Sequence, residues 1–303
     1  GFEAVDWGVE FPEEGKEVPA AEEDEGAGAL PSHPVTVKGD VWELVSEGKK
    51  LKHRVMCGDS TDSDAVATLM GGVKADMVFT DPPYGVDYSG GIQFKDGEAV
   101  KGARTKLAND DSEDIYRNSL TLLPLFTSGP IYTWFAGTKA KTIYSVVAEI
   151  GDLHAMIVWV KNGGYGALNA NYKQKHEPCL YWKPKGGRLN FVGETTETTI
   201  WEINKDGRNE FHPTQKPIAL AAKAIGNHDA DLVLDIFLGS GTTLIACEQL
   251  NRNCYGMELD EKYCDVIVRR WIAQMEKDGA KWKVFLNGEE RADMVAKLLE
   301  QGN

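Results

Sequence analysis

The stretch LVLDIFLGSGTTLIACEQLNRNCYGMEL, residues 232 to 259, constrains the fold of this chain more than any other segment. It reads as an apolar strand, a Gly-Ser-Gly turn, a helix and a second strand that ends on an acid. Two strands joined by a helix lie parallel in one sheet, because the helical crossover returns the chain to its starting end. Such sheets are covered by helices on both faces. The sequence therefore predicts an α/β protein with a doubly wound, mainly parallel sheet.

The same alternation of strand-like and helix-like segments continues on both sides of this unit. The expected strands are 41–45, 53–57, 76–80, 131–135, 154–161, 177–182, 198–203, 231–237 and 254–258. The expected helices are 62–70, 112–127, 139–150, 217–227, 242–250 and 260–277. Segments 85–111 and 162–175 are rich in glycine and show no regular apolar period. We expect them to be long loops, which in compact domains are usually functional or mobile.

The Gly-Ser-Gly turn has the chemistry of a nucleoside site. Gly239 and Gly241 allow a sharp turn and a close approach of the backbone to a ligand. The start of the following helix offers hydroxyls and backbone N–H groups that favour an anionic group. Those groups belong to Ser240, Thr242 and Thr243. Glu258 follows Gly241 by 17 residues and is placed to accept hydrogen bonds from two ribose hydroxyls.

Two related phosphate-binding motifs do not fit this turn. The third glycine of the dinucleotide fingerprint GxGxxG is missing, and no GK[ST] follows the glycines as in a P-loop. A plain tight turn between a strand and a helix would by itself explain Gly239 and Gly241. The acid at the end of the next strand favours nucleoside binding instead.

The stretch TDPPYG, residues 80 to 85, fixes an acid and an aromatic ring at the end of another strand. Residues 76–80 are expected to form a short buried strand. The two prolines end it, because proline donates no ladder hydrogen bond and restricts its own backbone. The sequence therefore places Asp81 at a strand end, with Tyr84 held on a stiff loop beyond it.

The charge of the chain is unevenly distributed. The formal net charge is −14, but residues 1–30 carry ten acids and one lysine. Between residues 161 and 223 the local balance is positive, with ten Lys/Arg against six Asp/Glu. A local basic face is what phosphate binding requires, whatever the total. Residues 1–34 are therefore expected to be an acidic linker or tail, ahead of a globular domain over 35–290 and a C-terminal helix or tail over 291–303.

The remaining composition points to an ordinary soluble protein. The chain has 303 residues, of which 42% are apolar, and neither a membrane span nor a signal peptide is recognisable. Five cysteines are scattered without a CxxC pair, which favours core thiols in a reducing cytoplasm and no metal site. The chain begins with Gly1 rather than Met, so we expect a fragment or a processed form.

The combination of D-P-P-Y with D-x-F-x-G-S-G resembles the S-adenosylmethionine-dependent amino-methyltransferases of DNA. The D-P-P-Y box comes first, which is the order of the β class of these enzymes. Four further boxes match in order: CGDS (57–60), IVWVK (157–161), KHEPCLYW (175–182) and HPTQKP (212–217). The resemblance covers residues 41 to 277 and departs from the family at Ile236, where close relatives often have proline. It implies a seven-stranded, Rossmann-like methyltransferase sheet with an inserted target-recognition region.

The resemblance also implies roles for individual residues. The catalytic set would be Asp81, Pro82, Pro83 and Tyr84. Asp81 and the carbonyl oxygen of Pro82 would accept the two hydrogens of an exocyclic amino group, and Tyr84 would stack on the flipped base. The cofactor set would be Asp59, Asp235, Phe237, Gly239, Ser240, Gly241, Thr242, Thr243, Glu258 and Lys216.

Within that set, Asp59 would bind the adenine amino group, Phe237 would pack near the adenine, and Lys216 would lie near the methionine carboxylate. Each has a simpler explanation. Asp59 also suits a turn or helix cap, Phe237 suits the apolar core, and Lys216 suits a solvated lysine at a helix start.

The expected partner is double-stranded DNA. The target-recognition segments would be 85–111 and 162–211, and the candidate phosphate contacts are Lys101, Arg104, Lys106, Lys173, Lys175, Lys183, Lys185 and Arg188. Relatives of this class are often homodimers, although no interface can be read from the sequence. The N-terminal GFEAVDW and the acidic stretch after it resemble the end of a ParB-like domain fused ahead of some such enzymes.

The sequence therefore predicts a cytoplasmic, bacterial or phage-encoded enzyme of the restriction-modification type that methylates adenine N6 in DNA. Three alternatives stay open. The first is the same chemistry on cytosine N4, although cytosine enzymes more often carry serine at the position of Asp81. The second is an RNA or protein-glutamine methyltransferase, which typically has the glycine box first and asparagine before the prolines. The third is an inactive DNA-binding module.

Overall fold

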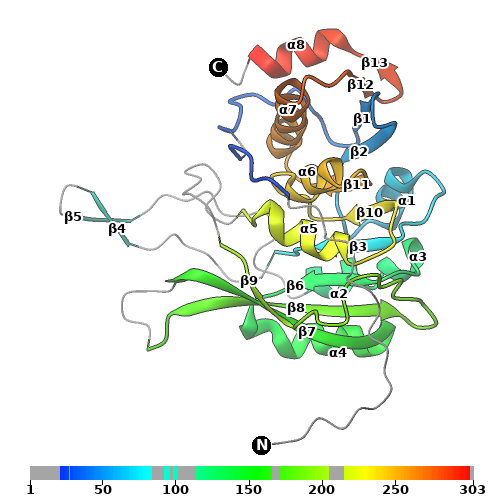
Figure 1. Cartoon of the computed structure of the whole chain (residues 1–303). Helices are drawn as coiled ribbons and strands as arrows, with labels where there is room; N and C mark the ends of the chain where they lie inside the picture. The colour runs from blue at the N-terminus through cyan, green and yellow to red at the C-terminus, as the bar shows by residue number, and fades with distance from the viewer. Residues whose placement is uncertain are drawn as a thin grey trace, which may run out of the picture.

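The computed structural model describes residues 21–26, 28–83, 92–95, 98–101, 114–165, 171–204 and 215–300. A single large sheet crosses the molecule, with helices packed against it (Figure 1). Two short strands, β4 and β5, form a separate hairpin that projects from the body of the protein (Figure 1).

The strands are β1 (Val41–Ser46), β2 (Leu51–Cys57), β3 (Met77–Thr80), β4 (Ile92–Lys95), β5 (Glu98–Lys101), β6 (Ile131–Trp134), β7 (Gly151–Tyr165), β8 (Gln174–Pro184), β9 (Ile200–Glu202), β10 (Leu232–Asp235), β11 (Asn253–Glu258), β12 (Trp282–Leu286) and β13 (Glu289–Glu290). The helices are α1 (Ser63–Met70), α2 (Asp114–Leu120), α3 (Leu123–Phe126), α4 (Ala140–Ile150), α5 (Ile218–Gly226), α6 (Thr242–Gln249), α7 (Glu261–Lys277) and α8 (Ala292–Glu300), with a 3₁₀ turn at Gly137–Lys139.

The large sheet has the strand order β13-β12-β1-β2-β11-β10-β3-β6-β8-β7-β9. Its centre, from β2 through β11, β10 and β3 to β6, is parallel. On one side β8 and β7 join antiparallel, and on the other β1, β12 and β13 do the same. The doubly wound, mainly parallel sheet is therefore confirmed. The sheet is wider than the seven strands expected, because β1, β12 and β13 extend one edge and β9 the other.

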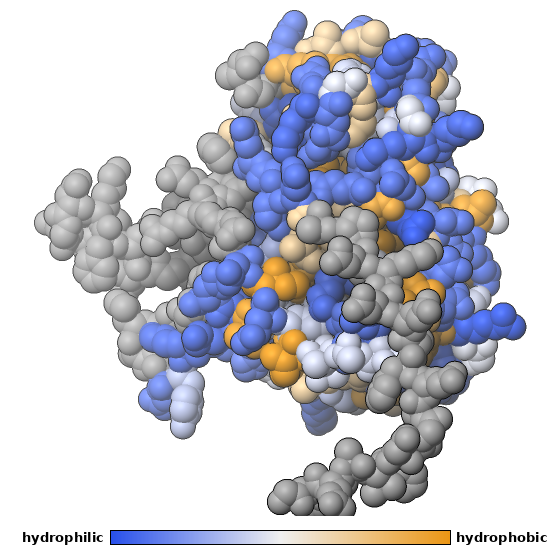
Figure 2. Space-filling view, viewed as in Figure 1, coloured by the Kyte–Doolittle hydropathy of each residue, from blue (hydrophilic) through white to orange (hydrophobic). Residues whose placement is uncertain are grey.

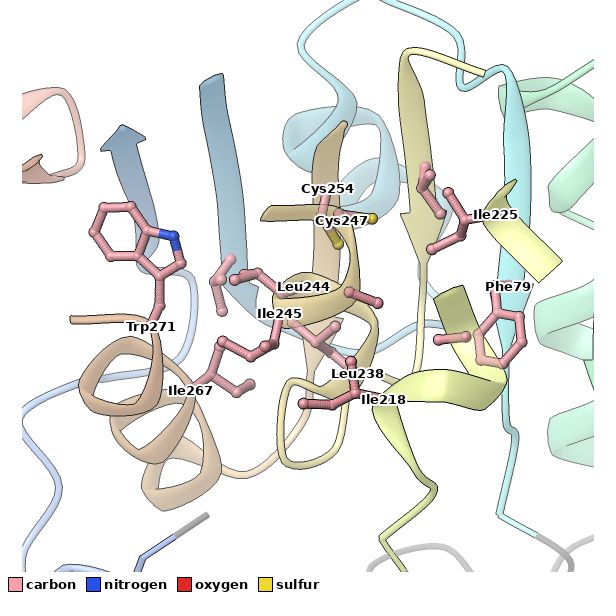
Figure 3. Close-up of a cluster of buried hydrophobic side chains, with 14 of the residues drawn as sticks. Phe79, Ile218, Ile225, Leu238, Leu244, Ile245, Cys247, Cys254, Ile267 and Trp271 are labelled. Carbon is pink, nitrogen blue, oxygen red and sulfur yellow. The ribbon is translucent and has the colours of Figure 1, made fainter. Parts of the chain in front are cut away.

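Each face of the sheet has its own apolar core. The first core joins α5, α6 and α7 to the strands, and the second joins α1, α2 and α4 to the opposite face. Figure 3 shows part of the first core, in which Leu244 and Ile245 of α6 lie between the sheet and Ile267 of α7. The face seen in Figure 2 is mostly hydrophilic, with apolar side chains surfacing in small patches.

Several segments differ from the sequence prediction. The helix expected over 112–127 is two helices, α2 and α3, and Pro124 stands at the start of the second. Strand β7 is 15 residues long and runs into the expected loop at 162–175. Part of the other expected loop, 85–111, forms the β4–β5 hairpin. The strands β12 and β13 were not anticipated.

The described part of the N-terminal acidic stretch lies against the domain. Backbone N–H groups of Val35 and Thr36 donate to the carboxylate of Asp265 on α7, at 2.7 and 3.0 Å. Glu22 and Gln249 exchange two hydrogen bonds at the end of α6. The described stretch is therefore anchored to α6 at Glu22 and to α7 at Val35 and Thr36. Within the described ranges, no helix is both long and apolar enough to cross a membrane.

Candidate active site at the edge of the parallel strands

Three acids lie where neighbouring parallel strands end. Asp235 is the last residue of β10, Glu258 is the last of β11, and Asp81 directly follows β3. Because β3, β10 and β11 are parallel neighbours, these ends meet at one edge of the sheet. Ligands of open α/β sheets bind at this carboxyl edge. The two informative stretches of the sequence therefore converge, as expected.

The glycine turn between β10 and α6 needs its glycines. Gly239 and Gly241 have φ angles of +56° and +88°, in the left-handed region that side chains disfavour. A Cβ on Gly241 would also lie 3.2 Å from Cγ2 of Ile267. The space beside Gly239 is open, with no atom within 4 Å of where its Cβ would stand. The backbone at Gly239 is therefore accessible to a ligand.

Glu258 braces the turn and lies in an unusual electrostatic setting. Its Oε2 accepts a hydrogen bond from the backbone N–H of Gly239 at 2.8 Å, and its Oε1 accepts one from Asp260 at 3.0 Å. Burial nevertheless dominates and raises the pKa of Glu258 to about 7. The carboxyl group thus changes charge close to neutral pH.

Asp235 points inward and holds the other side of the turn. Its Oδ2 accepts from the Thr243 hydroxyl at 2.6 Å, and its Oδ1 accepts from the N–H of Phe237 at 3.1 Å. Burial raises the pKa of Asp235 to about 6, against these two hydrogen bonds. The structure gives Asp235 and Thr243 a bracing role beneath the turn.

Asp81 is held by a buried lysine. The ammonium of Lys216 donates to Oδ2 of Asp81 and lies 3.2 Å from Oε2 of Glu177. Glu177 is in turn paired with Lys161. The Lys216 ammonium also lies 5.3 Å from the centre of the Trp134 ring, a cation–π contact. Two lysines and two carboxylates thus alternate along this edge of the sheet.

The charges in this cluster stabilise one another. Burial alone would lower the pKa of Lys216, but Asp81 and Glu177 outweigh it and the pKa is raised. Burial would likewise raise the pKa of Glu177, but Lys216 and Lys161 outweigh it and the pKa is lowered. Lys216 is therefore a cation at neutral pH, and a cation in contact with Asp81 favours the ionised carboxylate.

Lys216 also joins Asp81 to the glycine turn. Its backbone carbonyl accepts a hydrogen bond from the Thr242 hydroxyl at 3.3 Å. The side chain of the preceding Gln215 accepts one from the Ser240 hydroxyl at 3.2 Å. One short segment therefore touches both the acid of the D-P-P-Y stretch and the start of α6.

The other expected site residues are placed as follows. Asp59 is exposed after β2, and its Oδ1 accepts from the backbone N–H and the hydroxyl of Thr61 at 2.9 and 2.8 Å. This is the turn contact that was the simpler explanation for Asp59. Phe237 is partly buried and packs against the second core. Pro82 and Pro83 follow Asp81, whereas Tyr84 lies outside the described residues.

The candidate DNA contacts divide between the two ends of β8. Lys173 and Lys175 are exposed near its start, at the end that carries Glu177. Lys183 pairs with Asp152 at 2.7 Å, six residues beyond Glu177 and so about 20 Å away along the strand. Lys185 and Arg188 are exposed past that far end. The structure thus favours the first pair over the other three; Arg104 and Lys106 lie outside the described residues, as does the side chain of Lys101.

Two residues of this site were not singled out from the sequence. Glu177 was named as the first residue of an expected strand and quoted within a family box. A single acid beside an apolar strand gave no sign of its lysine partners. Arg270 is 5% exposed, and its Nη1 donates to the carbonyl oxygen of Ser240 at 2.9 Å. A signal for Arg270 existed, because it stands three residues after Ile267 and one before Trp271, on the apolar stripe of its helix.

Comparison with known proteins agrees with this geometry. The family model described as DNA methylase, of the N6/N4 methyltransferases, matches residues 75–269. That span includes Asp81, the glycine turn and Glu258. The chain belongs to the N6/N4 DNA methylase family. Its members are DNA amino-methyltransferases, acting on adenine N6 or cytosine N4.

Individual relatives agree with this family assignment. The type II methyltransferase M2.MboI of Moraxella bovis is 29% identical over 238 residues, which cover 69% of this chain and 85% of that protein. The crystal structure of the M1.HpyAVI–SAM complex is 25% identical, with a TM-score of 0.53, over 71% of this methylase and 98% of that chain. The cytosine-N4-specific PvuII DNA methyltransferase shares the fold, with a TM-score of 0.56 at 13% identity, over 91% of this chain and 96% of that one.

Proposed function

We propose that this protein transfers a methyl group from S-adenosylmethionine to the exocyclic N6 of an adenine flipped out of double-stranded DNA. The observation that carries the proposal is the lysine-held carboxylate of Asp81, joined through the backbone of Lys216 to the glycine turn. This connection brings an anionic acceptor for an amino group next to a nucleoside-type cofactor site.

The glycine turn fits the cofactor. Glu258 offers carboxylate oxygens at the strand end where ribose hydroxyls bind in such sheets. The open space beside Gly239 lets the backbone approach the ligand. The related M1.HpyAVI was solved as a complex with SAM, which supports the same cofactor here. When bound, S-adenosylmethionine supplies an electrophilic methyl group on a sulfonium centre.

The residues around Asp81 suit activation of an amino nitrogen. The lone pair of such a nitrogen is delocalised into the ring, so the free base is a poor nucleophile. A carboxylate that accepts one N–H and a carbonyl that accepts the other localise that lone pair. Asp81 and the carbonyl oxygen of Pro82 take these roles, with Tyr84 stacking on the base. Lys216 keeps Asp81 ionised and fixed, so little reorganisation is needed when the base arrives.

Aspartate at position 81 is what favours adenine, since serine is more frequent there in cytosine enzymes. Methylation of cytosine N4 is the alternative, and the shared fold of the cytosine-specific PvuII enzyme is compatible with it. Both reactions use the same carboxylate and the same cofactor. They differ only in the ring that enters beside Asp81.

Labelled S-adenosylmethionine tests the proposal. The protein is incubated with unmethylated DNA and labelled cofactor, and the DNA is digested to nucleosides for chromatography. We expect the label in N6-methyladenine, and label in N4-methylcytosine would overturn the assignment of the base. Asp81→Ala should remove the label while cofactor binding persists. The matched control is Asp152→Ala, which removes an exposed acid paired with Lys183 at the opposite end of the strands.

A further inference from the structure

Residues 21–26, here called the acidic strap, contact two of the elements that build the site. The strap is part of the dark blue trace beside α6 and α7 (Figure 1). Oε1 of Glu23 accepts a hydrogen bond from the backbone N–H of Ala219, in the first turn of α5, at 3.0 Å. Asp24 accepts two from Arg270 of α7, at 2.6 Å from Nε and 2.8 Å from Nη2.

Arg270 contacts the glycine turn as well as the acidic strap. Its remaining nitrogen, Nη1, donates to the backbone carbonyl of Ser240 at 2.9 Å and lies 3.3 Å from the Thr242 hydroxyl. Both acceptors belong to the turn that would hold the cofactor. The guanidinium therefore spans from the strap on one side to the turn on the other.

The burial of Arg270 makes its counter-charge important. The side chain is 3% exposed, and among the described residues Asp24 is the acid within salt-bridge distance of it. A buried charge that loses its partner is strongly unfavourable. Without the carboxylate of Asp24, the guanidinium gains by turning towards water, and the carbonyl of Ser240 then loses its donor.

Glu23 acts on the adjoining element. Helix α5 begins at Ile218, two residues after Lys216, and a carboxylate at its first turn satisfies an N–H that has no partner within the helix. The strap thus holds the helix that follows Lys216 and, through Arg270, the turn that follows β10. Its two consecutive acids thus contact the first turn of α5 and the arginine that supports the glycine turn.

We propose that Asp24 is a positioning residue for the cofactor turn, acting through Arg270, so that docking of the acidic strap and binding of S-adenosylmethionine favour each other. The inference rests on the proposed function for the identity of the ligand. Neither Asp24 nor Arg270 need touch the cofactor or the reacting atoms. Any change that separates Asp24 from Arg270 then weakens cofactor binding without removing a contact of Asp81.

Substitution of Asp24 gives the first test. The affinity for S-adenosylhomocysteine is measured by calorimetry in Asp24→Asn and in Glu25→Gln, which removes the same charge from the exposed neighbouring residue. We expect about tenfold weaker binding in D24N, since part of the effect of breaking a buried ion pair falls on the turn. E25Q should bind like the wild type, and Asp24→Glu should recover part of the affinity.

Kinetics separate positioning from general destabilisation. In D24N the KM for S-adenosylmethionine should rise while the KM for DNA stays unchanged, and kcat at saturating cofactor should stay within about twofold of wild type. A uniform loss of kcat with an unchanged KM for the cofactor would contradict a positioning role.

Reciprocity gives a test in the unaltered protein. Because coupling between two sites acts in both directions, bound S-adenosylhomocysteine should slow hydrogen exchange at the N–H of Glu22, which is bonded to Gln249. Unchanged exchange there, together with equal affinities in D24N and E25Q, would overturn the inference and leave the proposed function intact. Failure of the wild-type protein to bind S-adenosylhomocysteine would instead count against the proposed function.

Discussion

Asp81 and Glu258 lie at the ends of β3 and β11, at the same edge of the sheet, yet their charges are controlled in opposite ways. Asp81 is in contact with the buried ammonium of Lys216, which favours its ionised form. Glu258 is half-buried and its partners are neutral backbone N–H groups, so desolvation raises its pKa to about 7. A carboxylate in contact with a cation keeps its negative charge to lower pH than a carboxylate whose partners are only backbone N–H groups. The target half of the site is thus fixed in charge, and the cofactor half is adjustable.

Removal of the negative charge of Asp81 should have the largest effect on methyl transfer. In Asp81→Asn the shape is preserved but the negative charge is lost, so the amino group of the base is no longer activated. We expect methyl transfer to fall by at least about 100-fold, the usual effect of losing one stabilising group. Single-turnover assays with saturating DNA and cofactor measure this, and retained S-adenosylhomocysteine binding serves as the control for folding.

Removal of the cation should convert Asp81 into an adjustable group like Glu258. In Lys216→Met the carboxylate of Asp81 loses the contact that favours its ionised form. Activity should therefore fall as the pH is lowered and recover partly in alkaline solution. The matched control is Lys161→Met, which removes a partner of Glu177 but leaves Lys216 on Asp81. Equal pH profiles for the two variants would contradict the role given to Lys216.

The raised pKa of Glu258 predicts a pH-dependent affinity for the cofactor. If Glu258 binds the ribose hydroxyls in its ionised form, as proposed, affinity for S-adenosylhomocysteine should increase about tenfold between pH 6 and pH 8. Glu258→Gln should bind more weakly and lose this dependence. Calorimetry in buffers of different ionisation heat would also detect the proton released on binding. A flat profile in the wild-type protein would show that Glu258 is already ionised at pH 6.

The stability of the free protein should change with pH in the other direction. A raised pKa means that the folded protein holds the proton of Glu258 more tightly than the unfolded chain does. Its contribution to stability is complete below the unfolded pKa of about 4.3 and is lost as the pH rises through about 7. The midpoint of urea unfolding should therefore decrease over this window, and less so in Glu258→Gln.

The smallest effect concerns the brace beneath the turn. Thr243→Val keeps the shape of the side chain but removes the hydroxyl that donates to Asp235. We expect a loss of about 1–2 kcal/mol in the free energy of unfolding, because a buried acceptor is left without its donor. Thr68→Val on α1 is the control, since its hydroxyl is exposed and bonds only to the turn before it. That variant should lose less than about 0.5 kcal/mol.

The sequence predicted the elements with strong local signals. The glycine turn, the strand before the two prolines and the helix expected over 260–277 all depend on nearby residues, and the structure confirms them. The order of the boxes placed Asp81 and Glu258 at one edge, because parallel strands end on the same side. These features are local or follow from topology alone.

The partners of the charged residues could not be predicted in the same way. Lys216 was expected near the methionine carboxylate, and its contact with Asp81 joins residues 135 positions apart. The contact of Asp24 with Arg270 spans 246 positions. A run of acids in a segment poor in large apolar residues looks solvated unless its buried cation is known. Such pairs are set by tertiary packing, which no local pattern records.

The two outermost strands of the large sheet carry a consequence for how the protein behaves at high concentration. β13 has two residues and β9 has three, and both end in glutamate. An edge strand exposes unpaired backbone groups that can recruit another chain, and short, charged edges resist this. These two strands therefore offer little backbone of their own for a neighbouring molecule to extend, which disfavours intermolecular β-pairing at the two tips of the sheet.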